Sequence, residues 1–363
     1  MSAPVLIMAG GTGGHVFPAL ALARLLRANA RPVIWLGTRR GLEARVVPAE
    51  GFPVEWLSAA GLRGKGFVSL LKAPYMLVRS LWEALRIVRR HRPVVVVGFG
   101  GFVTGPGGLA AWLCRRPLLI HEQNAVAGST NRALAPLARE VLTAFPTAFP
   151  GYPRARMIGN PVRAEIASLP APVVRFSDRQ GAIRLLVVGG SLGALKLNQV
   201  VPQALAQMRA EGAAPEFTVR HQTGEKHLDA TRAAYAVARS DGEITAFIGD
   251  MAQALGWADL VICRAGALTI AELAAAGVGA VLVPYPHAVD DHQTVNAQFL
   301  VRAGAARCVA DSSLTPGLLA GLLRELCAGR ASLLQMAEAA RAVAMPDAAE
   351  QLYSACLSQE QRQ

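Results

Sequence analysis

The stretch that decides the fold is PVLIMAGGTGG, residues 4–14, an apolar run that ends in a glycine-rich turn and leads into a helix-like run over residues 15–27. A second opening of this kind comes half a chain later: IRLLVV, residues 183–188, leads into GGSLG and a helix-like run over residues 194–208. Continuous apolar strands followed by glycine and a helix are typical of buried parallel sheets. The pair predicts an α/β protein with two Rossmann-like domains in tandem.

Other segments extend this alternation and indicate the domain boundaries. Residues 94–97 and 260–263 are apolar strands followed by glycine turns, and residues 105–112 and 268–276 have helical character. A proline-rich stretch, residues 145–172, separates the halves, with the linker near Gly159-Asn160-Pro161. We therefore expect domains at 1–161 and 162–345, followed by a capped helix that starts at Asp347 and packs back on the first domain.

Composition excludes several classes of protein. Hydrophobic residues make up 52% of the 363 residues and no low-complexity tract interrupts them, which argues against disorder. The five cysteines are scattered without a CxxC pair, which predicts reduced core thiols of an intracellular protein and neither a disulfide framework nor a zinc site. The N-terminus lacks the basic region of a signal peptide, and glycines interrupt the longest uncharged run, residues 93–114, so no transmembrane helix is expected.

The net charge of +12 is unevenly distributed. Residues 1–156 contain 20 Lys and Arg against 6 Asp and Glu, whereas the remainder contains 17 against 19. Within the basic half, residues 61–93 mix aromatic and aliphatic side chains with eight Lys and Arg, opposed only by Glu83. Two interpretations stay open at this point: an amphipathic helix whose charged face meets water, and a segment that docks on anionic lipid.

Glycine turns that open helices indicate phosphate binding, because they present unpaired backbone N–H groups and the positive end of the helix dipole. The dinucleotide pattern G-x-G-x-x-G is incomplete, since its third glycine would fall on Val16. No carboxylate follows the strand at residues 33–36, although Arg39 and Arg40 leave an NADP 2′-phosphate open. The ATPase motif G-x-x-x-x-G-K-[ST] is absent.

Three further features are candidate site residues. The run Gly266 to Glu272 places a carboxylate in the first turn of a helix, where it could accept hydrogen bonds from a ribose diol or form a capping box with Thr269. His15 stands at a helix N-terminus and could act as a base or simply pack. The histidines and aspartates of residues 287–292 fit no standard metal-ligand spacing, so no metal site is expected.

The glycine turns after residues 9 and 188 and the run from Gly266 to Glu272 belong to eight sequence blocks. In their order along the chain, these blocks resemble the UDP-N-acetylglucosamine:undecaprenyl-diphospho-muramoylpentapeptide N-acetylglucosaminyltransferases of bacterial cell-wall synthesis. The resemblance runs along nearly the whole chain. It is carried by GGTGGHVFP (10–18), GFGGFVTGPGGLAA (98–111), HEQNAVAGSTN (121–131), GNPVR (159–163), GGSLGA (189–194), FIGDM (247–251), CRAGALTIAELAAAG (263–277) and DDHQTVNA (290–297). It implies the GT-B architecture, two Rossmann-like domains facing a cleft, with the UDP-sugar bound mainly by the second domain.

The resemblance also implies roles for individual residues. Glu272 would hold the ribose diol, which favours this role over the capping box, and His15 would be the catalytic base, with Glu122 in reserve. The other substrate-binding residues it implies are Thr12, Gly13, Gly14, Asn124, Arg163, Ser191, Ile248, Ala267, Leu268, Thr269, Ile270, Ala271 and Gln293. Leu192 and Ser129 depart from the family's usual Gln and Leu; the first removes a polar contact to the donor.

The implied reaction moves N-acetylglucosamine from UDP-GlcNAc to the 4-hydroxyl of the muramoyl sugar of lipid I, with inversion, giving lipid II. No metal or cofactor is implied. The partners would be UDP-GlcNAc, membrane-held lipid I and an anionic phospholipid surface at the cytoplasmic face of the inner membrane, with other cell-wall and division proteins as further candidates and no nucleic acid. Two rivals are a non-hydrolysing nucleotide-sugar epimerase, which leaves residues 61–92 unexplained, and a scaffold that recruits cell-wall enzymes.

Overall fold

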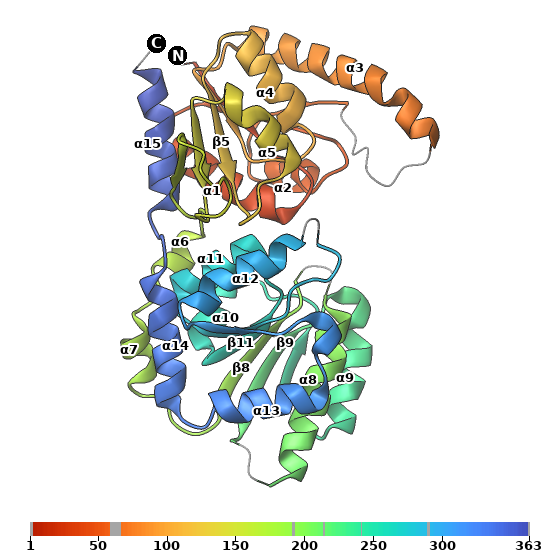
Figure 1. The fold of residues 1–363 in the computed structure, drawn as a ribbon, viewed down its shortest axis with the longest axis vertical. Coiled ribbons are helices and arrows are strands. Elements are labelled where there is room, and N and C mark those ends of the chain that lie inside the picture. The colour runs from red at the N-terminus through yellow and green to blue at the C-terminus, as the bar shows by residue number, and fades with distance from the viewer. Residues whose placement is uncertain are drawn as a thin grey trace. The chain divides into compact units, whose positions relative to one another are not determined.

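The computed structural model describes residues 3–58, 67–190, 193–212, 215–240, 242–288 and 291–361, with the side chains of 67–73 left aside. The chain divides into two compact units, Met1–Val162 together with Pro346–Gln363, and Arg163–Met345 (Figure 1). The first unit contains 21 Lys and Arg against 9 Asp and Glu, and the second contains 16 of each. The whole formal excess of positive charge therefore belongs to the first unit.

The first unit is built on a parallel sheet of seven strands in the order β3-β2-β1-β4-β5-β6-β7. The strands are β1 Val5–Met8, β2 Val33–Gly37, β3 Val54–Trp56, β4 Val95–Gly98, β5 Leu118–Glu122, β6 Glu140–Thr143 and β7 Ala155–Met157. The helices are α1 Gly13–Ala28, α2 Glu43–Ala49, α3 Phe67–His91, α4 Thr104–Leu113, α5 Ser129–Leu134 and α15 Ala348–Glu360, with a 3-10 turn at Ala135–Leu137.

Alternation along β1 fills the core on both faces of this sheet, because successive strand side chains point to opposite faces. Ile7 joins the cluster beneath α1 and α15, while Leu6 and Met8 join the cluster beneath α3 and α4. The C-terminal helix α15 packs against α1, so the last residues of the chain complete the first unit's core (Figure 1).

The second unit repeats the plan with six parallel strands in the order β10-β9-β8-β11-β12-β13. The strands are β8 Ile183–Val188, β9 Phe217–Gln222, β10 Gly242–Thr245, β11 Leu260–Cys263, β12 Gly279–Leu282 and β13 Ala306–Cys308. The helices are α6 Ala164–Ala167, α7 Pro172–Phe176, α8 Leu195–Ala210, α9 Leu228–Val237, α10 Met251–Trp257, α11 Ala267–Ala276, α12 His292–Arg302, α13 Pro316–Leu326 and α14 Arg330–Ala342, with 3-10 turns at Glu225–His227 and Asp311–Ser313.

Strand register brings the glycine turns of each unit together. In the first sheet the last residue of β1, Met8, pairs with Gly98 at the end of β4. In the second sheet Val188 at the end of β8 pairs with Cys263 at the end of β11. The strand order reverses at both places, and such switch points are where open α/β sheets bind ligands.

The prediction of two parallel-sheet α/β domains is confirmed. Two local predictions need correction. The first helix starts at Gly13, two residues before the predicted start, because the carbonyl of the extended N-cap residue Thr12 accepts the N–H groups of His15 and Val16. Asp347 stands at the N-cap of α15, but its side chain makes no capping hydrogen bond, since its φ of −85° and ψ of 17° are not the extended geometry that capping requires. Within the described part of the chain, no helix combines the length and apolarity needed to span a bilayer.

Candidate active site

In the first unit, the switch point is formed by the start of α1 and the turn after β4. Thr12 is extended and its carbonyl accepts the N–H groups of His15 and Val16, so the N–H groups of the preceding residues point beyond the helix end. The His15 ring lies against Gly100, where a Cβ atom would come within 3.0 Å of its Nε2. Gly100 also has a φ of +103°, so glycine is required there for both reasons. The His15 ring therefore lies at the first switch point, next to the turn after β4.

Glu122, at the end of β5, organises the neighbouring loop. Its side chain is buried, and each carboxylate oxygen already accepts hydrogen bonds. Oε1 accepts the Asn124 N–H at 3.0 Å, and Oε2 accepts the Gly128 N–H at 3.0 Å and the Asn131 Nδ2 at 2.8 Å. The loop from 124 to 131 is thus fixed on one carboxylate. This geometry favours a positioning role for Glu122 over that of a base.

The neighbouring His121 is a structural residue of the same strand end. It is fully buried, with Nε2 2.9 Å from the Gly159 carbonyl and Nδ1 3.0 Å from the Gln123 amide. Burial lowers the pKa of His121 to about 4. His121 therefore stays neutral at physiological pH and ties β5 to the segment that leaves the unit.

In the second unit, the start of α11 lies at the switch point. Gly266 is the N-cap, with extended φ and ψ, and Ala267, Leu268 and Thr269 form the first helical turn. Their N–H groups precede the first intrahelical bond, from the Ile270 N–H to the Gly266 carbonyl. The capping-box alternative is therefore wrong, because the helix starts before Thr269. Glu272 consequently lies in the second turn, where the sequence had suggested the first.

Glu272 is held by an arginine from far away in the sequence. Arg163 donates through Nε at 3.2 Å and through its terminal nitrogen at 2.8 Å, both to Oε1. Burial raises the pKa of Glu272, and the charge and hydrogen bonds of Arg163 act against that shift. No described residue bonds to Oε2. One carboxylate oxygen is thus oriented by Arg163 and the other is available to a ligand.

The residue directly after β9, Thr223, packs against the glycine turn that follows β8. Gly190 and Gly193 have φ of +82° and +78°, and a Cβ atom at Gly193 would overlap the Thr223 carbonyl oxygen. His221 supports this contact: its Nε2 lies 2.9 Å from Asn198 Oδ1, and the Asn198 amide donates to the same carbonyl at 3.1 Å. The predicted site residue Ser191 and its neighbour Leu192 lie outside the described residues.

Two further predicted contact residues, Ile248 and Gln293, lie in a loop and at the start of a helix that follow strands of the second sheet. Ile248 is half-buried in the loop between β10 and α10, and Phe247 beside it is 68% exposed. Gln293, in the first turn of α12, accepts the Tyr285 N–H at 2.9 Å through Oε1, so its amide bridges α12 to the loop after β12. Among the described residues, no three His, Cys, Asp or Glu side chains gather as metal ligands.

The structure therefore groups the predicted residues unit by unit. Thr12, Gly13, Gly14 and His15 lie at the first switch point, next to the loop that Glu122 fixes through Asn124. Arg163 and residues 267–272 form one cluster in the second unit. Sequence reasoning missed one buried carboxylate, Glu43 on α2, which fills the crevice between the ends of β1 and β2. Dinucleotide-binding folds hold a ribose in that crevice, so this geometry argues against the NADP alternative.

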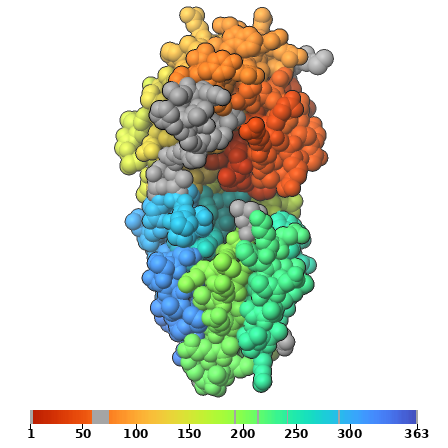
Figure 2. Space-filling model, turned by 90° about the vertical axis from the view of Figure 1, so that its right-hand side faces the viewer, coloured from red at the N-terminus to blue at the C-terminus, as the bar shows by residue number. Residues whose placement is uncertain are grey.

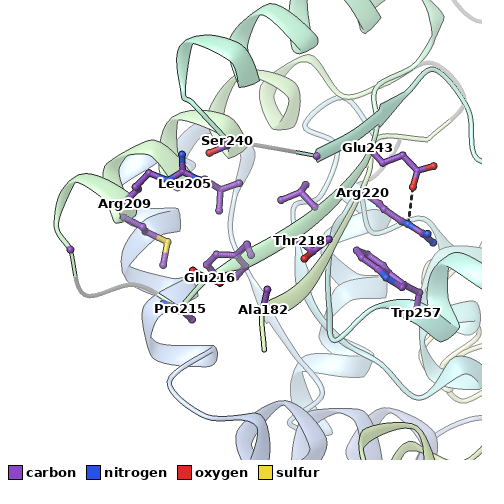
Figure 3. A pocket seen from close by; sticks show the side chains of 15 residues that line it. Ala182, Leu205, Arg209, Pro215, Glu216, Thr218, Arg220, Ser240, Glu243 and Trp257 are labelled. Atoms are coloured by element: carbon purple, nitrogen blue, oxygen red, sulfur yellow. Dashed lines mark ion pairs between the residues drawn. The ribbon is translucent and has the colours of Figure 1, made fainter. Parts of the chain in front are cut away.

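A cavity of about 740 Å³ lies elsewhere in the second unit, at the amino ends of β8, β9 and β10. Figure 3 shows Arg220 between Trp257 and Glu243 on its wall. The guanidinium lies 4.5 Å from the Trp257 ring and its Nε 2.9 Å from a Glu243 oxygen. These polar groups satisfy each other, and the cavity is at the sheet edge opposite the switch point. We therefore do not assign the substrate site to it.

The N-terminal domain of glycosyltransferase family 28 matches residues 5–143, and the C-terminal domain of that family matches residues 184–352. Together with two parallel sheets that carry helix N-termini at their switch points, these matches define a glycosyltransferase of GT-B architecture.

Named relatives make the assignment narrower. Two proteins named UDP-N-acetylglucosamine–N-acetylmuramyl-(pentapeptide) pyrophosphoryl-undecaprenol N-acetylglucosamine transferase align over nearly their whole length. The one from Marinobacter nauticus is 56% identical, covering 97% of this chain and 96% of its own, and the one from Alkalilimnicola ehrlichii is 55% identical, covering 99% of each. The crystal structure of Acinetobacter baumannii MurG has a TM-score of 0.87 and 40% identity, covering 98% of this chain and 100% of that one. The chain belongs to this family of N-acetylglucosamine transferases.

Proposed function

We propose that the protein transfers N-acetylglucosamine from UDP-GlcNAc to the 4-hydroxyl of the muramoyl sugar of lipid I, inverting the anomeric carbon and forming lipid II. The observation that carries the proposal is the second-unit cluster, in which a carboxylate held by Arg163 lies one turn into a helix where the N–H groups of Leu268 and Thr269 precede the first intrahelical bond. Such a cluster matches a nucleoside diphosphate, whose ribose diol donates hydrogen bonds and whose phosphates accept them.

On this proposal the donor is bound by the second unit. Oε2 of Glu272 accepts from the ribose hydroxyls, and the N–H groups of Leu268 and Thr269 take the diphosphate, with Ala267 before them and Ile270 and Ala271 continuing the helix. Ser191 would contribute to the same phosphates, Ile248 would bind uracil through its backbone, and Gln293 would contact the sugar. The positive end of α11 stabilises charge as it develops on the leaving UDP.

The first unit would provide the base and the acceptor site. The His15 imidazole accepts the proton of the acceptor 4-hydroxyl while that oxygen attacks the anomeric carbon. The bond from that carbon to the β-phosphate oxygen breaks on the opposite face, and its electron pair leaves with UDP. Thr12, Gly13 and Gly14 present N–H groups to an anionic group of the substrates, and Asn124 lines the same edge.

We further propose that the first unit docks on an anionic membrane surface through α3 and α4, which pack side by side (Figure 1). Tyr75, Val78 and Trp82, spaced three and four residues apart, are 68%, 69% and 60% exposed. Trp112 on α4 is 50% exposed. α3 and the turn after α4 also carry exposed arginines: Arg79, Arg86, Arg89, Arg90 and Arg115. Arg79 and Arg90 pair with Glu83 and Glu55. The orange residues of α3 lie on the surface of the first unit in Figure 2.

Each such arginine contributes about 1 kcal/mol of attraction to anionic lipid, so half of the group gives roughly 2–3 kcal/mol, to which the exposed aromatic side chains add apolar contact. This is sufficient for reversible peripheral binding and fits a membrane-held acceptor.

The test is a transfer assay. Purified protein, UDP-GlcNAc and a lipid I analogue, without added metal, should release UDP and form the disaccharide product together, in equal amounts. Release of UDP at the same rate without acceptor, or conversion of UDP-GlcNAc to an epimer, would contradict the transferase proposal.

A further inference from the structure

The buried carboxylate of Glu43 has no part in the reaction as described, and yet it contacts the first glycine turn. Glu43 is the first residue of α2 and is fully buried. Its Oε2 accepts the Gly11 N–H at 2.9 Å, and its Oε1 accepts the Thr38 N–H at 3.0 Å and the Thr38 hydroxyl at 2.7 Å. One carboxylate thus joins the turn after β1 to the turn after β2.

Three glycines make room for this side chain. A Cβ atom at Gly10 would lie 2.7 Å from a Glu43 carboxylate oxygen, and one at Gly37 would lie 2.9 Å from its Cγ. At Gly41 a Cβ atom would overlap Oε2. The glycines of these turns therefore serve a protein carboxylate as well as any ligand.

Further contacts connect the residues bound by Glu43 to the turn after β4 and to His15. On the side of β4, a Cβ atom at Gly101 would lie 2.5 Å from the Gly10 carbonyl oxygen, so that turn packs directly on Gly10. Gly100, the preceding residue, contacts the His15 ring. The peptide of Gly10 and Gly11 is thus clamped between Glu43 and the turn after β4, and α1 starts two residues beyond it.

We infer that Glu43 is a positioning residue for transfer: by fixing the Gly11 N–H it sets where the start of α1 and the His15 imidazole lie relative to the acceptor. The inference rests on the proposed function. Because the Gly11 N–H is bound by Glu43, it does not contact substrate, and anion binding at this turn falls to the N–H groups of Thr12, Gly13 and Gly14.

The decisive variant is Glu43→Gln, which keeps the shape but replaces one acceptor oxygen by an N–H₂ donor. The donors of Gly11 and Thr38 meet the side chain from two directions, so one backbone N–H must face another donor. Small displacements of catalytic groups cost up to about a hundred-fold in rate. We therefore expect kcat to fall by about ten- to a hundred-fold. KM for UDP-GlcNAc and Kd for UDP should stay unchanged, because on the proposed function the second unit binds the donor.

Glu50→Gln is the matched control, because Glu50 follows the same helix and pairs with Arg24 at the surface. It should leave kcat unchanged. Active-site concentration is taken from UDP binding, so loss of folded protein is not counted as loss of kcat. Thr38→Val provides a second, milder variant that keeps Glu43 and removes one donor; a fall in kcat of about two- to five-fold with UDP affinity unchanged is expected.

The outcomes separate the two proposals. If the wild-type protein does not transfer sugar to lipid I, the proposed function is wrong. If it does, and both Glu43→Gln and Thr38→Val keep wild-type kcat per UDP-binding site, even with a lower melting temperature, then Glu43 only stabilises the fold and the inference is overturned.

Discussion

Replacing Glu272 by Gln should abolish recognition of the ribose diol while preserving the fold. In the wild-type protein Oε1 is already shared with two guanidinium N–H groups, at 3.2 and 2.8 Å, which leaves Oε2 as the main acceptor for the diol. A hydrogen bond to a charged group contributes about 1.5–3 kcal/mol. Glutamine loses one acceptor oxygen and the charge, so we expect UDP to bind about 2 kcal/mol more weakly, roughly 30-fold in Kd.

The assay is calorimetric titration with UDP and with 2′-deoxy-UDP, which lacks one of the two hydroxyls. The wild-type protein should prefer UDP by about ten-fold or more, and Glu272→Gln should reduce that preference to within about three-fold. Glu338→Gln, an exposed glutamate on α14, is the matched control and should behave as wild type. If Glu272→Gln weakens both nucleotides but preserves the wild-type preference, the carboxylate does not contact the diol and the assignment is refuted.

Four other predictions concern catalysis, membrane binding and stability. His15→Ala should lower kcat by about 10²–10⁴-fold with little change in KM for UDP-GlcNAc, measured by steady-state kinetics with the lipid I analogue. Trp82→Ser should weaken binding to vesicles that contain anionic lipid, measured by co-sedimentation, while transfer to a short, soluble acceptor stays unchanged. Burial lowers the pKa of His121 to about 4 and of His221 to about 3, against about 6.5 in an unfolded chain. The unfolded chain therefore binds more protons below pH 6.5. The free energy of unfolding, measured by urea titration, should fall as the pH is lowered from 6.5 to 4, by up to about 1.4 kcal/mol per pH unit for each histidine. Asp259→Asn should cost about 3–5 kcal/mol in the second unit by urea denaturation, because the fully buried carboxylate pairs with two arginines.

Local sequence patterns predict the strands, glycine turns and helices, because these elements depend on residues that are close together in the chain. The apolar strand before Gly10 and the one before Gly189 each form a strand of a parallel sheet, and both glycine turns lead into helices, because burial and backbone freedom are encoded within a few residues. The same pattern locates the carboxyl edge of each sheet, which is where the candidate residues lie.

Contacts between distant segments could not be predicted in this way. Spacing alone allowed Glu272 to be part of a capping box or a ligand contact. The structure removes the capping box because Gly266 is the N-cap, and it pairs Glu272 with Arg163, 109 residues away. Glu43 was missed because its partners are two backbone N–H groups and one hydroxyl, up to 32 residues distant, and the glycines around it resemble ordinary phosphate-binding turns. A buried carboxylate bound by N–H groups has no signature in composition or spacing.

The pairing of Arg163 with Glu272 also resolves an electrostatic conflict in the proposed donor site. A carboxylate suits a diol, but it places negative charge near a diphosphate that the start of α11 is meant to attract, and burial strengthens that repulsion. The second unit is neutral overall, so no general excess of positive charge offsets it. Arg163 supplies the compensation locally: it binds Oε1 and leaves Oε2 for the ribose. Arg163→Ala should therefore weaken UDP more than uridine, because without the arginine the carboxylate still accepts from the diol but repels the phosphates. Equal weakening of both ligands in the same titration would mean that the arginine merely holds the carboxylate in place.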